Sequence, residues 1–227
     1  GILNLTPDSF SGDGLLREGT PLLEAALAQA RRFVAEGADL LDVGGESTRP
    51  GAQRVSLEEE LARVVPVIER LAKEMDLPIS VDTCKAEVAR AALQAGAHLV
   101  NDVWGLRNPG GEGWNEALAA RVSEAGVPIV LMHNRRARAT LDELGGHYRE
   151  AAYQDLMGEV FADLEESVAY AVAQGIPWER IIVDPGIGFG KTPEQNLEVM
   201  RRLCELRSLG RPILIGTWAA ATWAVRF

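Results

Sequence analysis

The feature that most constrains the fold of this chain is a repeated turn. An amphipathic stretch ends in a short turn containing glycine, and a short apolar run follows. These glycines are Gly37, Gly96, Gly126, Gly175 and Gly210. Glycine suits the left-handed position just after a helix, and in three of the turns a proline two residues later stops the helix from continuing. Each turn therefore marks the end of a helix and the start of a strand.

Between the turns, the pattern predicts strands and helices in alternation. The predicted strands are residues 40–43, 79–81, 99–100, 129–132, 181–183 and 213–215, with residues 1–3 as the end of a further strand. The predicted helices are about 20–36, 57–74, 85–95, 114–125, 148–174 and 193–209. Strands that are apolar throughout are typical of a sheet covered on both faces, and strand–helix alternation indicates a parallel sheet.

Seven such strands without a glycine-rich dinucleotide loop favour a closed barrel over an open doubly wound sheet. The predicted fold class is therefore α/β, a TIM (β/α)8 barrel, with the eighth strand and helix largely missing from the residues given. A length of 227 residues suits one large core, so we expect a single domain over residues 1–227.

Composition excludes several classes of function. The net charge of −10 argues against bulk nucleic-acid binding, which needs a basic surface. No apolar run approaches the roughly 18 residues needed to cross a membrane. The two cysteines, Cys84 and Cys204, form no disulfide framework and suit a reducing cytoplasm. We therefore expect a cytoplasmic protein that acts on small molecules.

Polar residues close most of the predicted strands, and in barrel enzymes this end of the strands carries the active site. They are Asn4, Asp42, Asp82, Asn101, Asp102, His133 and Asp184, while Gly216 closes the seventh strand. An Asp or Asn at one strand end is as readily a helix cap or a turn residue. The repetition at one rim favours a functional ring.

The ring contains no nucleophile–base pair and no cluster of His and Cys residues. Asp82 and Asp184 can accept paired N–H donors, such as those of an aminopyrimidine edge, and Asn101 can both donate and accept. Such groups recognise a flat heterocycle rather than attack it. The oxygen of Asn4 is a candidate contact for Mg²⁺ that bridges to a phosphate.

Six motifs in the chain resemble those of the dihydropteroate synthase family, the sulfonamide target of folate synthesis, and they occur in the family's order. They are residues 1–11 (GILNLTPDSFS), 42–51 (DVGGESTRPG), 80–83 (SVDT), 101–102 (ND), 131–133 (LMH) and 184–191 (DPGIGFGK). The resemblance implies a transferase. The amine of p-aminobenzoate attacks the methylene carbon of 6-hydroxymethyl-7,8-dihydropterin diphosphate, and diphosphate leaves. It also implies Mg²⁺ and a homodimer.

The resemblance assigns roles to individual residues. Asp82, Asn101 and Asp184 would hold the pterin, and Met132 would line its pocket. Asn4 would lie near Mg²⁺ and the diphosphate. Thr48 and Gly216 would contact substrate. Mobile loop residues that close over p-aminobenzoate would be Asp8, Phe10, Arg49 and Pro50.

Most of these residues also have a purely structural interpretation. Asp8 follows a proline and could be a turn residue, Phe10 could anchor its loop, and Arg49 could pair with Glu46 or Asp42. Met132 alone would be assigned to the core. Lys191 could be a solvated surface group and is not among the assigned site residues. We favour a buried, hydrogen-bonded His133 over an acid–base role.

The chain departs from the family pattern after Gly216. The family has Ser-Arg-Lys soon after this glycine and Arg-x-His on strand eight, and residues 217–227 contain neither. We expect segments to be left out of the sequence there. Two other functions stay open. One is a pterin-binding methyltransferase domain, against which the loops at residues 6–9 and 47–50 argue. The other is a pterin-binding paralogue without catalysis.

Overall fold

The computed structural model describes residues 1–6, 21–47, 54–109, 112–141 and 148–216. Six strands form one parallel sheet in the order β1-β2-β3-β4-β5-β8. Their bounds are β1 (Ile2–Asn4), β2 (Leu41–Gly44), β3 (Ile79–Asp82), β4 (Leu99–Asp102), β5 (Ile129–Met132) and β8 (Ile181–Asp184). The strands follow the chain order, so each pairs with the strand before it.

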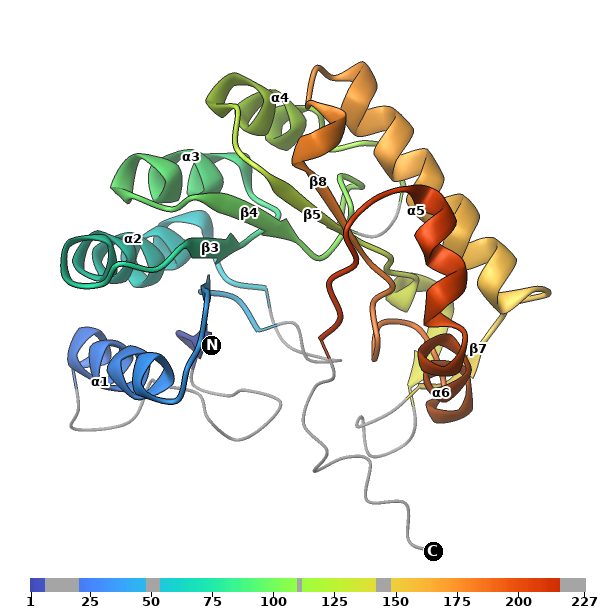
Figure 1. Ribbon diagram of the computed structural model, residues 1–227, viewed down its shortest axis with the longest axis horizontal. Helices are drawn as coiled ribbons and strands as arrows, with labels where there is room; N and C mark the ends of the chain where they lie inside the picture. Colours follow the sequence, from blue (N-terminus) through green and yellow to red (C-terminus); the bar gives the residue numbers. More distant parts are fainter. Residues whose placement is uncertain (7–20, 48–53, 110–111, 142–147, 217–227) are drawn as a thin grey trace, which may run out of the picture.

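A helix follows each of these strands, and together the helices enclose the sheet. They are α1 (Leu22–Ala35), α2 (Leu57–Glu74), α3 (Ala86–Ala95), α4 (Glu116–Ala125), α5 (Leu156–Ala173) and α6 (Pro193–Arg201). Figure 1 shows them as an arc on the outer side of the sheet, running from α1 through α4 to α6. None of the helices in the described ranges is both long and apolar enough to cross a membrane.

The fold is an α/β barrel of the TIM type, and the described residues form most of its wall. Ile213 pairs with Val183 in a single parallel bridge, where a seventh strand runs beside β8. Counting only strands of the barrel wall, which excludes β6 and β7, no eighth strand occurs among the residues that the structure describes. The predicted fold class, including the largely missing eighth unit, is confirmed.

Strands β2 and β3 bury apolar side chains on the outer face and carry polar side chains on the interior face, whereas the interior face of β5 carries Val130 and Met132. Successive side chains of a strand point to opposite faces. In β2, Leu41 and Val43 are fully buried, and in β3 Ile79 and Val81 are fully buried. These residues join one large core with apolar residues of the surrounding helices. The intervening residues, among them Asp42, therefore face the interior of the barrel.

Two predicted helices are shorter than expected. The helix predicted from residue 148 is wrong at its start, because Tyr148–Ala151 forms strand β7, which pairs antiparallel with β6 (Ala139–Leu141). Helix α5 begins only after Asp155, whose carboxylate accepts a hydrogen bond from Gly158 N at 3.2 Å. The helix predicted at 193–209 divides into α6 and a 3-10 helix, Leu203–Leu209.

Helix α2 begins and ends where the sequence predicts. Ser56 precedes it in an extended conformation, and its hydroxyl accepts a hydrogen bond from Glu59 N at 3.1 Å. This contact satisfies one of the amide groups that have no partner at a helix start. Strand β5 also has its predicted bounds, and the other strands agree to within two residues at each end.

The loops after β5 and β8 cross very closely. Gly186 has φ of +66°, a left-handed conformation that L side chains rarely adopt. A Cβ atom at this position would overlap the carbonyl oxygen of His133. The glycine therefore permits the backbone after Asp184 to pass directly over the end of β5.

We predict that Gly186→Ala destabilises the protein by about 3 kcal/mol or more, because left-handed strain adds to a backbone overlap. Gly126→Ala is the matched control, since Gly126 has φ of +63° with no atom within 4 Å of the added Cβ. Its cost should be about 1 kcal/mol, from strain alone. Urea unfolding of both variants measures the difference, and equal losses would contradict the overlap.

Candidate active site

Four residues from four neighbouring strands form one continuous row at the carboxyl end of the sheet. Asn4 is paired in register with Gly44, Gly44 with Asp82, and Asp82 with Asn101. Residues in register on neighbouring parallel strands project to the same face. The interior of the barrel therefore presents an amide, a carboxylate and a second amide side by side, with Gly44 leaving space beside Asp82.

On the next two strands, β5 and β8, the row continues two residues closer to the carboxyl ends. Asn101 is in register with Val130, and two residues further on Met132 is in register with Asp184. This shift follows from the stagger of strands around a barrel. The Asp184 side chain is buried, and its Oδ1 accepts a hydrogen bond from Gly186 N at 2.6 Å. Asp82, Asn101, Met132 and Asp184 thus meet around one interior space.

Asp42 supports this row from the layer below. Asn101 donates a hydrogen bond from Nδ2 to Asp42 Oδ2 at 3.2 Å, which orients the Asn101 amide. Asp42 and Ser80 are in register on β2 and β3, and the buried Ser80 hydroxyl is a second donor toward the Asp42 carboxylate. Asp42 is therefore held by two neighbouring polar side chains of the interior.

The carboxylates of the interior affect one another's ionisation. Burial, followed by the negative charges of Asp42, Glu60 and Asp102, raises the pKa of Asp82 well above its usual value. Burial also raises the pKa of Asp42, against hydrogen bonds from Ser80 and Asn101. Burial raises the pKa of Asp184 to about 6, against the Gly186 amide and the charge of Lys191. A cationic or N–H-rich ligand would relieve this repulsion.

Asp102 belongs to the turn after β4 rather than to the interior. Its two carboxylate oxygens accept hydrogen bonds from Trp104 N at 3.0 Å and Leu106 N at 2.6 Å, and its side chain is fully buried. Burial raises its pKa to about 7, against these two hydrogen bonds. The turn interpretation, one of the two offered by the sequence, describes this residue.

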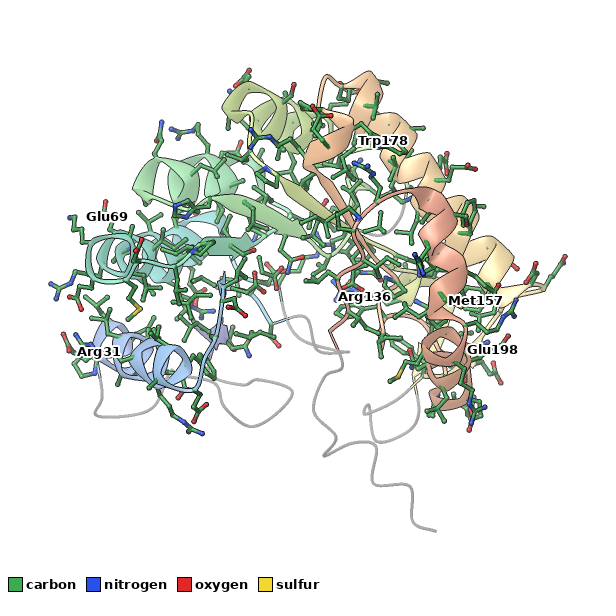
Figure 2. The ribbon with its side chains drawn as sticks, viewed as in Figure 1. Arg31, Glu69, Arg136, Met157, Trp178 and Glu198 are labelled. Atoms are coloured by element: carbon green, nitrogen blue, oxygen red, sulfur yellow. The ribbon has the colours of Figure 1, made fainter. Side chains whose placement is uncertain are left out.

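An apolar wall stands beside the polar row. Val103, Trp104, Met132 and Phe189 form a small buried cluster, separate from the main core. The Arg136 guanidinium lies 4.5 Å from the centre of the Trp104 ring. Figure 2 shows Arg136 on the inner side of the arc of helices, whereas Glu69 lies on the outside. The site thus combines hydrogen-bonding groups with a surface against which a flat ring can pack.

An ion cluster anchors both ends of the loop after β2. The Lys85 ammonium donates to Glu46 Oε2 at 2.6 Å and to Val55 O at 2.8 Å, and it also pairs with Glu60. Thr83 donates to Glu60 Oε1 at 2.6 Å. Glu46 and Val55 flank residues 48–53, so the start and the end of that loop are fixed beside the interior row.

Five of the candidate residues lie on the interior face near the carboxyl ends of the strands, and their roles in binding stay predictions: Asn4, Asp82, Asn101, Met132 and Asp184. Gly216 is half-buried, three residues beyond the Ile213 bridge and therefore near the carboxyl end of β8. The remaining candidates lie outside the described residues: Asp8, Phe10, Thr48, Arg49 and Pro50. Residues 217–227 lie outside as well, so the expected omission after Gly216 stays a prediction.

The solvated surface position, which the sequence left open for Lys191, is wrong. The Lys191 side chain is only 1% exposed, and its Nζ lies 2.8 Å from His133 Nδ1. A sequence of Gly-x-Gly-x-Gly-Lys indicates a loop but does not show which way the lysine points. The preferred interpretation of His133 as a buried, hydrogen-bonded histidine is confirmed. His98 is also structural, since its Nδ1 accepts from Ile79 N at 3.1 Å.

Fold and site together define an α/β-barrel enzyme whose interior recognises a flat, N–H-rich heterocycle. A family model described as pterin binding enzyme matches residues 1–218. The chain is 46% identical to the dihydropteroate synthase of Bacillus subtilis over 217 residues, which cover 96% of this chain and 68% of that protein. The chain therefore belongs to the pterin-binding enzyme family, among relatives named dihydropteroate synthase.

Solved structures agree with this assignment. One is the Xanthomonas albilineans dihydropteroate synthase with 4-aminobenzoic acid, which matches with a TM-score of 0.81 at 43% identity over 96% of this chain and 71% of that chain. Another is the enzyme from the same organism in complex with 7,8-dihydropteroate, with a TM-score of 0.77 at 40% identity over 96% and 71% of the two chains.

The buried His133 generates a prediction about stability at low pH. Burial and the nearby charge of Lys191 lower its pKa to about 3, so the folded protein keeps it neutral. The unfolded chain protonates His133 below about pH 6.5. The contribution of His133 to the free energy of unfolding is therefore fully present above pH 6.5 and is lost as the pH falls towards 3.

We predict that, between pH 8 and pH 5, the free energy of unfolding falls by about 2 kcal/mol less in His133→Gln than in the wild type. The reason is that the unfolded variant has no histidine at this position to take up a proton. The variant should still be less stable at pH 8, where the contact with Lys191 is lost. Urea unfolding at both pH values is the measurement, and an unchanged pH dependence in His133→Gln would contradict the buried neutral state.

Proposed function

We propose that this protein condenses 6-hydroxymethyl-7,8-dihydropterin diphosphate with p-aminobenzoate to give 7,8-dihydropteroate and diphosphate, a transferase reaction of folate biosynthesis. The observation that carries the proposal is the interior row in which Asp82, Asn101 and Asp184 surround one space. Two carboxylates and an amide complement the N–H and carbonyl groups along the edge of a pterin ring.

The chemistry needs positioning more than an attacking side chain. The lone pair of the aromatic amine forms a C–N bond at the methylene carbon as the C–O bond to diphosphate breaks, and the nitrogen then loses a proton. Positive charge develops on the pterin at the transition state. Carboxylates held at the ring, such as those of Asp82 and Asp184, stabilise that charge without rearrangement.

The apolar wall supports the same proposal from a second side. Met132 and Trp104 present flat, apolar surface next to the hydrogen-bonding row, so a ring held by Asp184 would pack against them. A ring fixed in this way holds its methylene carbon in one place for the incoming amine, which converts a bimolecular encounter into an oriented one. Asp8, Phe10, Thr48, Arg49, Pro50 and Gly216 remain proposed contacts of the substrates.

Asp82→Asn tests the proposal, because it replaces an acceptor of the row with a donor. We predict a loss of roughly 1.5–3 kcal/mol in affinity for dihydropteroate, about ten- to a hundredfold. The same change should raise the free energy of unfolding at pH 7, since the carboxyl group has a raised pKa and ionising it in the fold is unfavourable.

Asp76→Asn is the matched control, because this exposed residue lies just before the amino end of the same strand. It should change neither dihydropteroate affinity nor turnover. Isothermal titration calorimetry with 7,8-dihydropteroate, together with turnover of the two substrates, supplies the measurement. Unchanged affinity in Asp82→Asn would remove Asp82 from the pterin site. A wild-type protein that forms no dihydropteroate would overturn the proposed function.

We also propose that Mg²⁺ acts with the diphosphate, next to Asn4. Asn4 ends β1, is half-buried, and makes no hydrogen bond to the described residues, so its amide oxygen is available. The described residues contain no group of three or more His, Cys, Asp or Glu side chains that could hold a metal. This composition fits an ion bound chiefly by phosphate oxygens and water, as Mg²⁺ often is. The ion would neutralise charge on the leaving group.

Chelation of Mg²⁺ should therefore abolish most turnover while leaving the affinity for dihydropteroate unchanged, because that ligand carries no diphosphate. Turnover with and without excess EDTA, restored by added MgCl₂, is the measurement. Full turnover in EDTA would contradict a metal role. A homodimer and a cytoplasmic location remain proposals, the second in keeping with Cys84 and Cys204, which are both free thiols.

A further inference from the structure

Lys191 has a buried environment that the proposed reaction does not explain. Its side chain is 1% exposed, and a lysine ammonium group is rarely buried without compensation. Its Nζ lies 2.8 Å from His133 Nδ1 and donates hydrogen bonds to Gly186 O at 2.9 Å and to Phe189 O at 3.4 Å. Three partners thus hold one ammonium group inside the protein.

These partners come from two loops that both leave the site. His133 directly follows Met132 at the end of β5, and its backbone N–H donates to Asp184 O at 2.9 Å. Gly186 accepts from Lys191 with its carbonyl oxygen and donates with its N–H to the Asp184 carboxylate at 2.6 Å. Gly186 therefore links Lys191 through hydrogen bonds to the carboxylate that we assign to the pterin.

Among the charged groups around Lys191, Asp184 is the carboxylate whose ionised form the ammonium group stabilises. Asp184 from β8 and Asp163 from α5 attract the ammonium group, whereas Arg135 repels it. Asp163 already accepts a hydrogen bond from Arg135 Nε at 2.7 Å, and its Oδ2 lies 3.2 Å from Nε2 of the neutral His133. For Asp184, Lys191 is the cation that favours the ionised form.

We propose that Lys191 is a positioning residue for the pterin site: its buried ammonium group joins the loops after β5 and β8 and keeps the Asp184 carboxylate ionised for the ring. This inference rests on the proposed function, since it takes the pterin to be the ligand of Asp184. Burial lowers the pKa of Lys191 itself to about 7, so the ammonium form prevails near pH 6, where Asp184 titrates.

Lys191→Met tests the inference, because it keeps the length of the side chain and removes its charge. We expect wild-type affinity for 7,8-dihydropteroate to fall as the pH drops below about 6, when Asp184 becomes protonated. In Lys191→Met the carboxyl group loses its cation, so the midpoint of this fall should move about one pH unit higher. Calorimetry from pH 5 to 8 measures the midpoint, and an unchanged midpoint overturns the inference.

His133→Gln separates charge from packing. It removes a neutral partner of the ammonium group but leaves the charge, so the midpoint should remain that of the wild type even though stability decreases. An equal shift in both variants would mean that Lys191 acts through loop packing alone, which overturns its electrostatic role. Circular dichroism establishes that each variant is folded.

If Lys191→Met does not fold, the wild type still decides the question. Lys191 is one of three lysines in the chain, so the ¹³C resonance of its ε-carbon can be assigned and titrated. The proposal requires a charged ammonium group at pH 6, and a neutral one overturns it. Failure of the proposed function has a different signature, since the wild type would then bind no dihydropteroate at any pH.

Discussion

The burial of carboxyl groups close to one another is the constraint on which the rest of this structure depends. The charge of Asp42 raises the cost of ionising Asp82 inside the barrel, and Asp184 is buried on β8, three strands further along the sheet from Asp82. Such an interior destabilises the fold, so the stability comes from the opposite face of the same strands. There, fully buried residues such as Val43 and Val81 pack under the surrounding helices. Because successive side chains of a strand point to opposite faces, alternate residues of β2 and β3 contribute to stability on one face and to recognition on the other.

The sequence was informative where the signal is local. The helix at 57–74 could be predicted to the residue because Ser56 caps it and its apolar positions have helical spacing. The strand ends could be predicted because parallel strands place their last residues at one rim. Residues in register there, such as Asp82 and Asn101, had to become neighbours once the fold class was known.

The failures concern contacts between separate segments of the chain, some of them adjacent and some far apart. Tyr148–Ala151 carries no local signal against a helix, and it becomes a strand because Ala139–Leu141 lies beside it. The orientation of Lys191 depends on His133, 58 residues earlier. The hydrogen bond from Asn101 to Asp42 likewise spans 59 positions, and the sequence around either residue does not predict it. Side-chain partners of this kind become visible only when the strands are placed in register.

The anchors of the loop after β2 have a consequence for how that loop can vary. Lys85 holds Glu46 and Val55 in place, so the contacts of Lys85 already offset the entropic cost of bringing the two ends of the loop together. Lengthening a loop between fixed ends costs little, about 0.6 kcal/mol for each doubling of its length. A change in the number of residues between the two anchors should therefore alter the free energy of folding only slightly.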